Sequence, residues 1–206
     1  MLQISTGKLF ARPVGRENLL RGMLYTNAIL AREEAVETVA GRLSASSSYS
    51  IRPTVLVYEL TERMEAEEQG PGVLVSSGVE PYLQDYSVAV SFALNCVCTP
   101  DVDLARRLTT GQRGLATRVA PQTLVHRFFD GEIWCKPDEL TFLAEFLGKL
   151  IGLPRHTFLG VMRALRTYVN GMHRIADDLE LAYTLLVASV ELSLIHISEP
   201  TRQEAI

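Results

Sequence analysis

Hydrophobic and polar positions alternate with two different periods along the chain, and the change falls near residue 135. Before it, apolar residues recur at every second position in several short segments, which indicates β-strands with one buried face. After it, they recur every three or four positions, which indicates amphipathic helices. The sequence therefore predicts an α+β protein. A mainly antiparallel β region spans residues 1–135, and the first helices of a truncated helical bundle span residues 136–191.

Two segments carry the strongest strand pattern. In Ser87–Thr99, valine, phenylalanine, leucine and cysteine fall on one face, while serine, alanine and asparagine fall on the other. This alternation predicts a half-buried strand. Thr54–Thr61 is rich in β-branched and aromatic residues and predicts a second strand.

Further β structure is expected in three weaker segments. Leu124–Cys135 predicts a hairpin with Asp130 and Gly131 at its turn, because a type I′ turn needs positive φ at both central residues. Short strands are also expected near Lys8–Arg12 and Arg21–Ala28.

Two helices have clear boundaries in the sequence. Asp101–Leu108 is a short helix with Asp101 available as its N-terminal cap. A longer helix begins at Pro137 and ends at Gly152, because proline suits the first turn and glycine suits the residue that follows a helix.

The longest apolar stripe lies near the C-terminus. It fits one long helix, or two helices that meet near Asn170–Gly171, in a bundle. Its positions follow alternating spacings of four and three: Phe158, Met162, Leu165, Val169, Met172, Ala176, Leu179, Tyr183, Leu186 and Val190.

The final segment, Leu192–Ile206, resembles a translated sequencing adapter, so we expect the encoded protein to diverge after Glu191. The rival interpretation is a natural helix end that Pro200 terminates. The apolar run Leu181–Ile197 overlaps this segment and contains Glu191, so it does not predict a membrane span.

Composition describes an ordinary globular protein. Apolar residues make up 47% of the chain and charged residues 21%, with a formal net charge of −4. This balance requires neither nucleic acid nor an anionic membrane as a partner. The chain has an odd number of cysteines, three, and its N-terminus lacks a secretory signal pattern, so we expect free thiols and a cytoplasmic location.

Three cysteines and one histidine raise the question of a metal site. Cys96, Cys98, Cys135 and His126 are ligand types that zinc accepts, but the two-residue knuckle spacing is absent. We therefore interpret the cysteines as core thiols and expect no metal and no cofactor. Glycine-rich phosphate loops and nucleophile motifs are also absent from the sequence.

An arginine cluster is the first candidate binding site. It could neutralise the phosphates of a nucleic acid. The alternative, which we favour, is a solvated surface that pairs with the acidic loop at Glu65–Glu68. The candidate residues for nucleic-acid binding are Arg106, Arg107, Arg113 and Arg118, with Arg127 nearby.

Arg166 and His173 are the candidate catalytic residues. They lie seven positions apart on one helical flank, and the imidazole could act as an acid or a base near neutral pH. Seven residues span about 10 Å of helix, so the two side chains should not touch within one straight helix. The alternative, which we favour, is a solvated helical flank or a packing histidine that pairs with Glu180.

The segments Arg163–His173 and Asp177–Glu191 together resemble the opening helices of the Apea-like branch of the HEPN family. The resemblance covers about Pro154–Glu191. It implies a helical bundle that forms a homodimer and acts as an RNA-binding module or metal-independent ribonuclease in toxin or antiviral defence systems.

The signature of that family is an arginine followed closely by a histidine in a late helix. Six residues separate Arg166 from His173, which satisfies the spacing, but the resemblance places the functional pair beyond Glu191. Two hypotheses follow: a protein that binds or cleaves RNA, and a non-catalytic protein-interaction or assembly module. A small-molecule enzyme in the β region is disfavoured, because no polar motif converges there.

Overall fold

A computed structural model describes residues 1–12, 14–31, 34–46, 52–65, 78–109 and 121–198 of the chain. The N-terminal half forms an antiparallel sheet of five strands in the order β3-β4-β5-β1-β6, which confirms the α+β class. The strands are β1 (Val14–Thr26), β3 (Ala35–Thr38), β4 (Gly41–Ala45), β5 (Thr54–Glu65) and β6 (Cys98–Thr99). A second, two-stranded sheet pairs β2 (Ala28–Ile29) with β7 (Ile133–Trp134).

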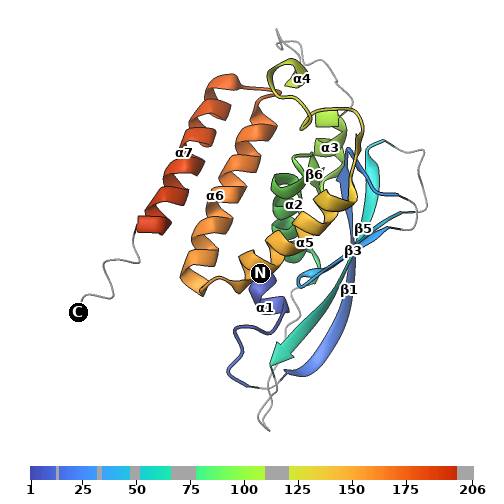
Figure 1. Ribbon diagram of the computed structural model, residues 1–206, viewed down its shortest axis with the longest axis vertical. Coiled ribbons are helices and arrows are strands. Elements are labelled where there is room, and N and C mark those ends of the chain that lie inside the picture. The colour runs from blue at the N-terminus through green and yellow to red at the C-terminus, as the bar shows by residue number, and fades with distance from the viewer. Residues whose placement is uncertain (13, 32–33, 47–51, 66–77, 110–120, 199–206) are drawn as a thin grey trace.

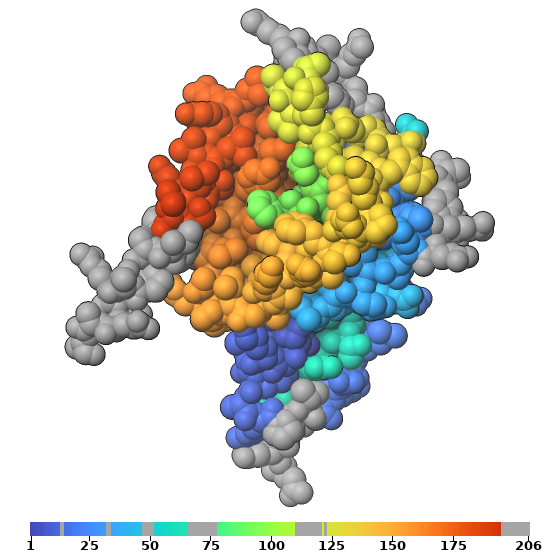
Figure 2. Space-filling view, in the orientation of Figure 1, coloured from blue at the N-terminus to red at the C-terminus, as the bar shows by residue number. Residues whose placement is uncertain are grey.

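Helices cover one face of the sheet and then stack outward (Figure 1). The helices α2 (Glu80–Leu94) and α5 (Pro137–Gly152) pack on the sheet, and α6 (Arg155–Arg174) and α7 (Leu179–Ser198) follow as an antiparallel pair. Figure 2 shows the orange and red surfaces of that pair side by side. Three short helices complete the fold: α1 (Leu2–Ser5), α3 (Val102–Thr109) and α4 (Pro121–Leu124).

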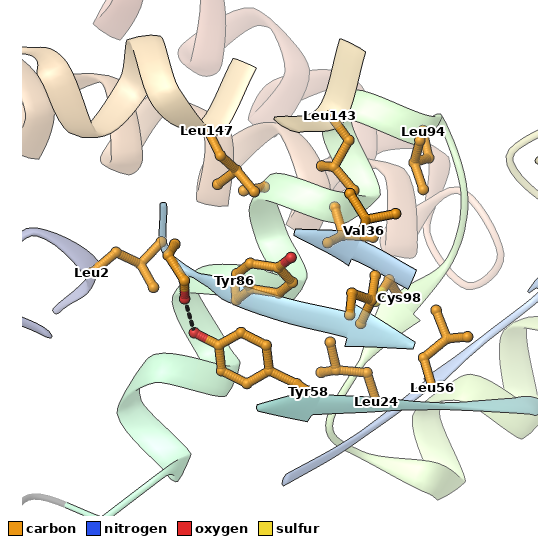
Figure 3. Close-up of a cluster of buried hydrophobic side chains, with 14 of the residues drawn as sticks. Leu2, Leu24, Val36, Leu56, Tyr58, Tyr86, Leu94, Cys98, Leu143 and Leu147 are labelled. Atoms are coloured by element: carbon orange, nitrogen blue, oxygen red, sulfur yellow. Dashed lines mark hydrogen bonds between the residues drawn. The ribbon is translucent and has the colours of Figure 1, made fainter. Parts of the chain in front are cut away.

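The larger of the two apolar clusters among the described residues joins the sheet to α2, α5 and α6. Leu24 and Leu56 from the central strands and Leu143 and Leu147 from α5 all belong to it (Figure 3). The rings of Tyr58 and Tyr86 lie 4.2 Å apart, centroid to centroid. The Tyr58 hydroxyl donates a hydrogen bond of 2.5 Å to the carbonyl of Ala40, which ties the β3–β4 turn to the core.

The strongest strand prediction, Ser87–Thr99, is wrong over most of its length. Residues up to Leu94 belong to α2, and only Cys98–Thr99 forms a strand. The helical period begins upstream, where Tyr82, Tyr86 and Val90 are buried four residues apart. Because α2 is enclosed by the sheet on one side and by other helices on the other, small residues alternate with large ones along it and imitate a strand pattern.

The hairpin predicted over Leu124–Cys135 is also wrong. Only Ile133–Trp134 is a strand, and it pairs in parallel with β2. The Asn27 side chain binds the backbone there instead: its amide donates to the carbonyls of Phe128 at 2.9 Å and Asp130 at 2.7 Å. Asn27 therefore ties two carbonyls of this segment to the end of β1.

Lys8–Arg12 forms no strand, which corrects the prediction there. Instead, the Lys8 ammonium donates hydrogen bonds of 2.6 Å and 2.8 Å to the carbonyls of Ile151 and Leu153 at the end of α5. The other local predictions are confirmed. Thr54–Thr61 lies in β5, Arg21–Ala28 falls mostly within β1, and α5 has the predicted boundaries.

The long C-terminal stripe forms two helices, the second of the two arrangements considered. The break lies at Ile175–Asp178, a few residues after the expected Asn170–Gly171. Gly171 serves helix packing instead, because a Cβ there would lie 3.1 Å from the Leu186 side chain. The helix α7 continues through residues 192–198 of the adapter-like segment. None of the described helices is long and apolar enough to span a membrane.

Candidate functional site

A cavity of about 710 Å³ opens where α3 meets the α6–α7 turn. Two of the helices that form it begin at an aspartate cap. Asp101 caps α3 by accepting hydrogen bonds from the backbone of Asp103 at 2.9 Å and Leu104 at 3.0 Å, as predicted. Asp178 caps α7 by accepting from the Leu181 backbone at 3.0 Å. The polar side chains that line the cavity are Asp101, Asp103, Arg107, Asn170, His173 and Arg174.

His173 is the chemically distinctive residue of this cavity. Its Nε2 is buried and has no hydrogen-bond partner among the described residues, so the alternative pairing through this atom with Glu180 is not seen. The ring packs against Phe128, with centroids 6.1 Å apart. The pKa of His173 is lowered from 6.5 to about 4, mainly by burial and in addition by the charges of Arg107 and Arg174. The imidazole is therefore neutral at physiological pH.

Two guanidinium groups share one carboxylate at the rim. The Nη2 of Arg107 lies 3.3 Å from Oδ2 of Asp177, and the Nη1 of Arg174 lies 3.9 Å from the same oxygen. Both distances exceed the 2.7 to 2.9 Å or so that is typical of a strong charge-assisted hydrogen bond. Asp177 therefore orients the two arginines without saturating their donors.

The structure brings together one residue from each of the two candidate sets. Arg107, from the arginine cluster, and His173, from the catalytic pair, line the same cavity, although they are far apart in the sequence. Sequence reasoning missed Asn170, Arg174 and Asp177. Their only sequence signal is their place at the end of an amphipathic helix, which does not show what faces them.

Arg166 lies elsewhere and does not line this cavity. Its guanidinium forms an ion pair with Asp85, a buried residue of α2. The amino group of Met1 lies 2.6 Å from the same carboxylate. Arg166 thus belongs to a structural network at the N-terminus, while His173 lies in the cavity.

The remaining arginines have separate positions. Arg106 pairs with Asp103 at 3.8 Å, and Arg127 pairs with Glu139 at 2.6 Å. Arg113 and Arg118 lie outside the described residues, as does most of the acidic loop expected to pair with the cluster. Among the described residues, Arg107 pairs with Asp177 of the α6–α7 turn.

Cys96 and Cys98 are buried, as predicted for core thiols, and Cys135 is partly buried. Burial raises the pKa of Cys96 to about 12 and that of Cys135 to about 11, so both remain protonated at neutral pH. Within the described ranges, no group of three or more histidine, cysteine or acidic side chains is arranged to hold a metal ion.

The lowered pKa of His173 predicts a specific pH dependence of stability. The unfolded chain binds a proton at the ordinary pKa of 6.5, whereas the folded chain resists protonation until about pH 4. This contribution to stability is therefore complete above pH 6.5 and is lost as the pH falls through that window. When the pH is lowered from 7.5 to 5.0, the free energy of unfolding falls in both proteins. We expect the fall to be about 2 kcal/mol smaller in His173→Gln than in the unsubstituted chain.

Urea denaturation at the two pH values measures this difference. His156→Gln, a substitution outside the cavity, serves as the control and should follow the unsubstituted chain. Equal pH dependence in the His173 and His156 variants would contradict the assignment.

No protein-family model, no curated protein and no solved structure matches this chain.

Proposed function

We propose that this chain binds RNA through the cavity between α3, α6 and α7. The observation that carries the proposal is the convergence of Arg107, Arg174 and His173 on one cavity. Arginine recognises phosphate oxygens with two parallel hydrogen bonds, and the loose contacts to Asp177 leave donors for them.

The other polar groups of the cavity suit a single-stranded ribonucleotide. The Asn170 amide can donate to and accept from a base edge or a 2′-hydroxyl. Asp103 pairs with Arg106 at 3.8 Å, and Asp101 accepts the capping hydrogen bonds of α3. Arg107 and Arg174 are the basic side chains that line the cavity and would attract an anion.

We further propose that the same cavity cleaves the bound RNA without a metal ion. The neutral His173 would accept the proton of a 2′-hydroxyl through Nε2 after its ring turns toward the cavity, because this atom is buried in the ligand-free fold. The 2′-oxygen would then attack the adjacent phosphorus, and the 5′-oxygen would depart and take a proton from water, leaving a 2′,3′-cyclic phosphate. A bound phosphate raises the pKa of the imidazole toward neutrality, because an opposite charge nearby favours the protonated form. This is the activity that the HEPN resemblance implies for toxin and antiviral defence proteins.

RNA binding is tested by fluorescence anisotropy with a labelled single-stranded oligouridylate. We expect Arg107→Ala and Arg174→Ala each to weaken binding about tenfold and to reduce the salt dependence by about one phosphate contact. Arg106→Ala is the matched control, because it removes the same charge from the neighbouring position, which does not line the cavity. Equal losses in the Arg106 and Arg107 variants would exclude the cavity as the binding site.

Cleavage is measured in the same samples with EDTA present. His173→Ala should abolish the cyclic phosphate product and retain most of the binding. Product formation by that variant would contradict a catalytic role for His173 and leave RNA binding as the function.

A second candidate function is a protein-interaction module that forms a homodimer through α7. The observation that favours it is an exposed apolar face on that helix: Tyr183 is 72% exposed, Val187 40% and Val190 57%. These positions are four and three residues apart, so they lie on one side of the helix. Light scattering on the anisotropy samples separates the two functions. A dimer without RNA affinity would favour this candidate.

A further inference from the structure

The strand β5 is paired on both sides for only part of its length. Its last partner in β4 is Arg42, opposite Glu59. β4 begins at Gly41, where φ is +127°, and the preceding strand, β3, pairs with β4 and not with β5. The strand continues to Glu65, and over that stretch it pairs only with β1 in the part of the chain that is described.

The hydrogen-bonding pattern shows which groups face the open side. The Ser46 backbone donates a hydrogen bond of 3.1 Å to the Val55 carbonyl. The backbone N–H and C=O groups of the odd-numbered residues of β5 therefore face β4. Thr61 and Arg63 continue this series beyond the end of β4. Their N–H and C=O groups therefore lie along an open edge, and both residues are exposed.

This open edge borders a cavity of about 810 Å³. Figure 2 shows the teal surface of β5 exposed between the dark blue N-terminal segment and the light blue β3–β4 hairpin. The opposite wall is the end of α5, where Gly148 and Gly152 flank Ile151. A Cβ added to either glycine would meet no atom within 4 Å, so the two glycines leave a hollow beside an apolar residue.

The wall is held in place without any ligand. The last carbonyls of α5 accept hydrogen bonds from Lys8 and from the Gln3 amide, at 2.6 to 2.9 Å. The charges along the cavity are paired as well, with Arg42 at 3.1 Å from Glu37 and Arg63 at 3.3 Å from Glu17. A cavity with paired charges does not favour a nucleic acid, which requires unpaired cations.

We infer that the open edge of β5 binds an extended peptide segment of a partner protein as an added antiparallel strand. The peptide lies in line with β4 and exchanges main-chain hydrogen bonds with Thr61 and Arg63. Alternate side chains of a strand point to opposite faces. One set therefore enters the hollow beside Ile151 and is apolar, and the other set lies beside the exposed Thr61 and Arg63 side chains and is polar. This surface is separate from the cavity proposed for RNA.

Peptide selection tests this inference. A displayed library of random peptides is panned against the full chain, with counter-selection on Thr61→Pro. That variant lacks the N–H at the open edge, and proline is tolerated on edge strands. We expect enrichment of peptides in which apolar residues alternate with polar ones. Failure to enrich any peptide over the Thr61→Pro chain would overturn the inference.

An enriched peptide is then synthesised and titrated by fluorescence anisotropy. We expect Gly148→Trp, which fills the hollow, and Thr61→Pro each to weaken binding at least tenfold, while Gly148→Ala and Thr61→Val bind as the unsubstituted chain does. N-methylation of the peptide tests the main-chain bonds without altering the protein. Methyl groups on one alternate set of residues should abolish binding, and on the other set should have little effect. Equal effects of the two methylated peptides would overturn the added-strand arrangement.

Discussion

Asp85→Asn is expected to lower the free energy of unfolding by about 2 to 3 kcal/mol. The Asp85 side chain is only 2% exposed, and it holds both the amino group of Met1 and the guanidinium of Arg166. Removing the carboxylate leaves two cations facing a neutral amide. The expected loss is below the 3 to 5 kcal/mol or so typical of fully buried pairs, because both cations can regain some water.

Urea denaturation followed by circular dichroism measures this effect. Arg166→Gln is the matched control. Its side chain is 52% exposed, so its removal should lower the unfolding free energy by no more than about 1 kcal/mol. A smaller loss of stability in Asp85→Asn than in Arg166→Gln would contradict this prediction. It would mean that the cost of burying the Asp85 carboxylate equals the stabilisation that its two ion pairs provide.

Gly41→Ala is expected to destabilise the fold by about 3 kcal/mol or more. The φ of +127° at Gly41 is a conformation that L side chains rarely adopt. A Cβ there would also lie 2.6 Å from the Glu59 carbonyl oxygen and 2.8 Å from the Tyr58 ring. Strain and overlap therefore act at the same position, where β4 begins its pairing with β5.

The comparison substitution is Gly148→Ala in α5. No atom lies within 4 Å of the added Cβ, and alanine is the better helix former, so we expect a gain of about 0.5 to 1 kcal/mol. Thermal or urea denaturation of the two variants should thus shift in opposite directions. A loss of stability in Gly148→Ala comparable to that in Gly41→Ala would mean that conformation and local space do not explain either result.

The candidate site was predictable only in pieces. The sequence identifies Arg107 and His173 as residues able to bind an anion or transfer a proton, because those properties belong to the side chains. It places them in separate sets, and it pairs His173 with Arg166. The fold reverses this grouping, since Asp85 binds Arg166 while α3 and α6 bring Arg107 next to His173.

The sequence by itself determined the elements whose signals are local. Proline and acidic residues at the start of α5, Asp101 at the start of α3, and β-branched residues in β5 act within a few positions of where they stand. The tertiary structure decided the rest. The α2 segment has a strand-like pattern because it is enclosed on both sides. The predicted hairpin is absent: β7 pairs with β2, and Asn27 binds two carbonyls of the segment. Gly171 remains helical because Leu186 packs against it. Each depends on residues distant in sequence, whose positions no local pattern specifies.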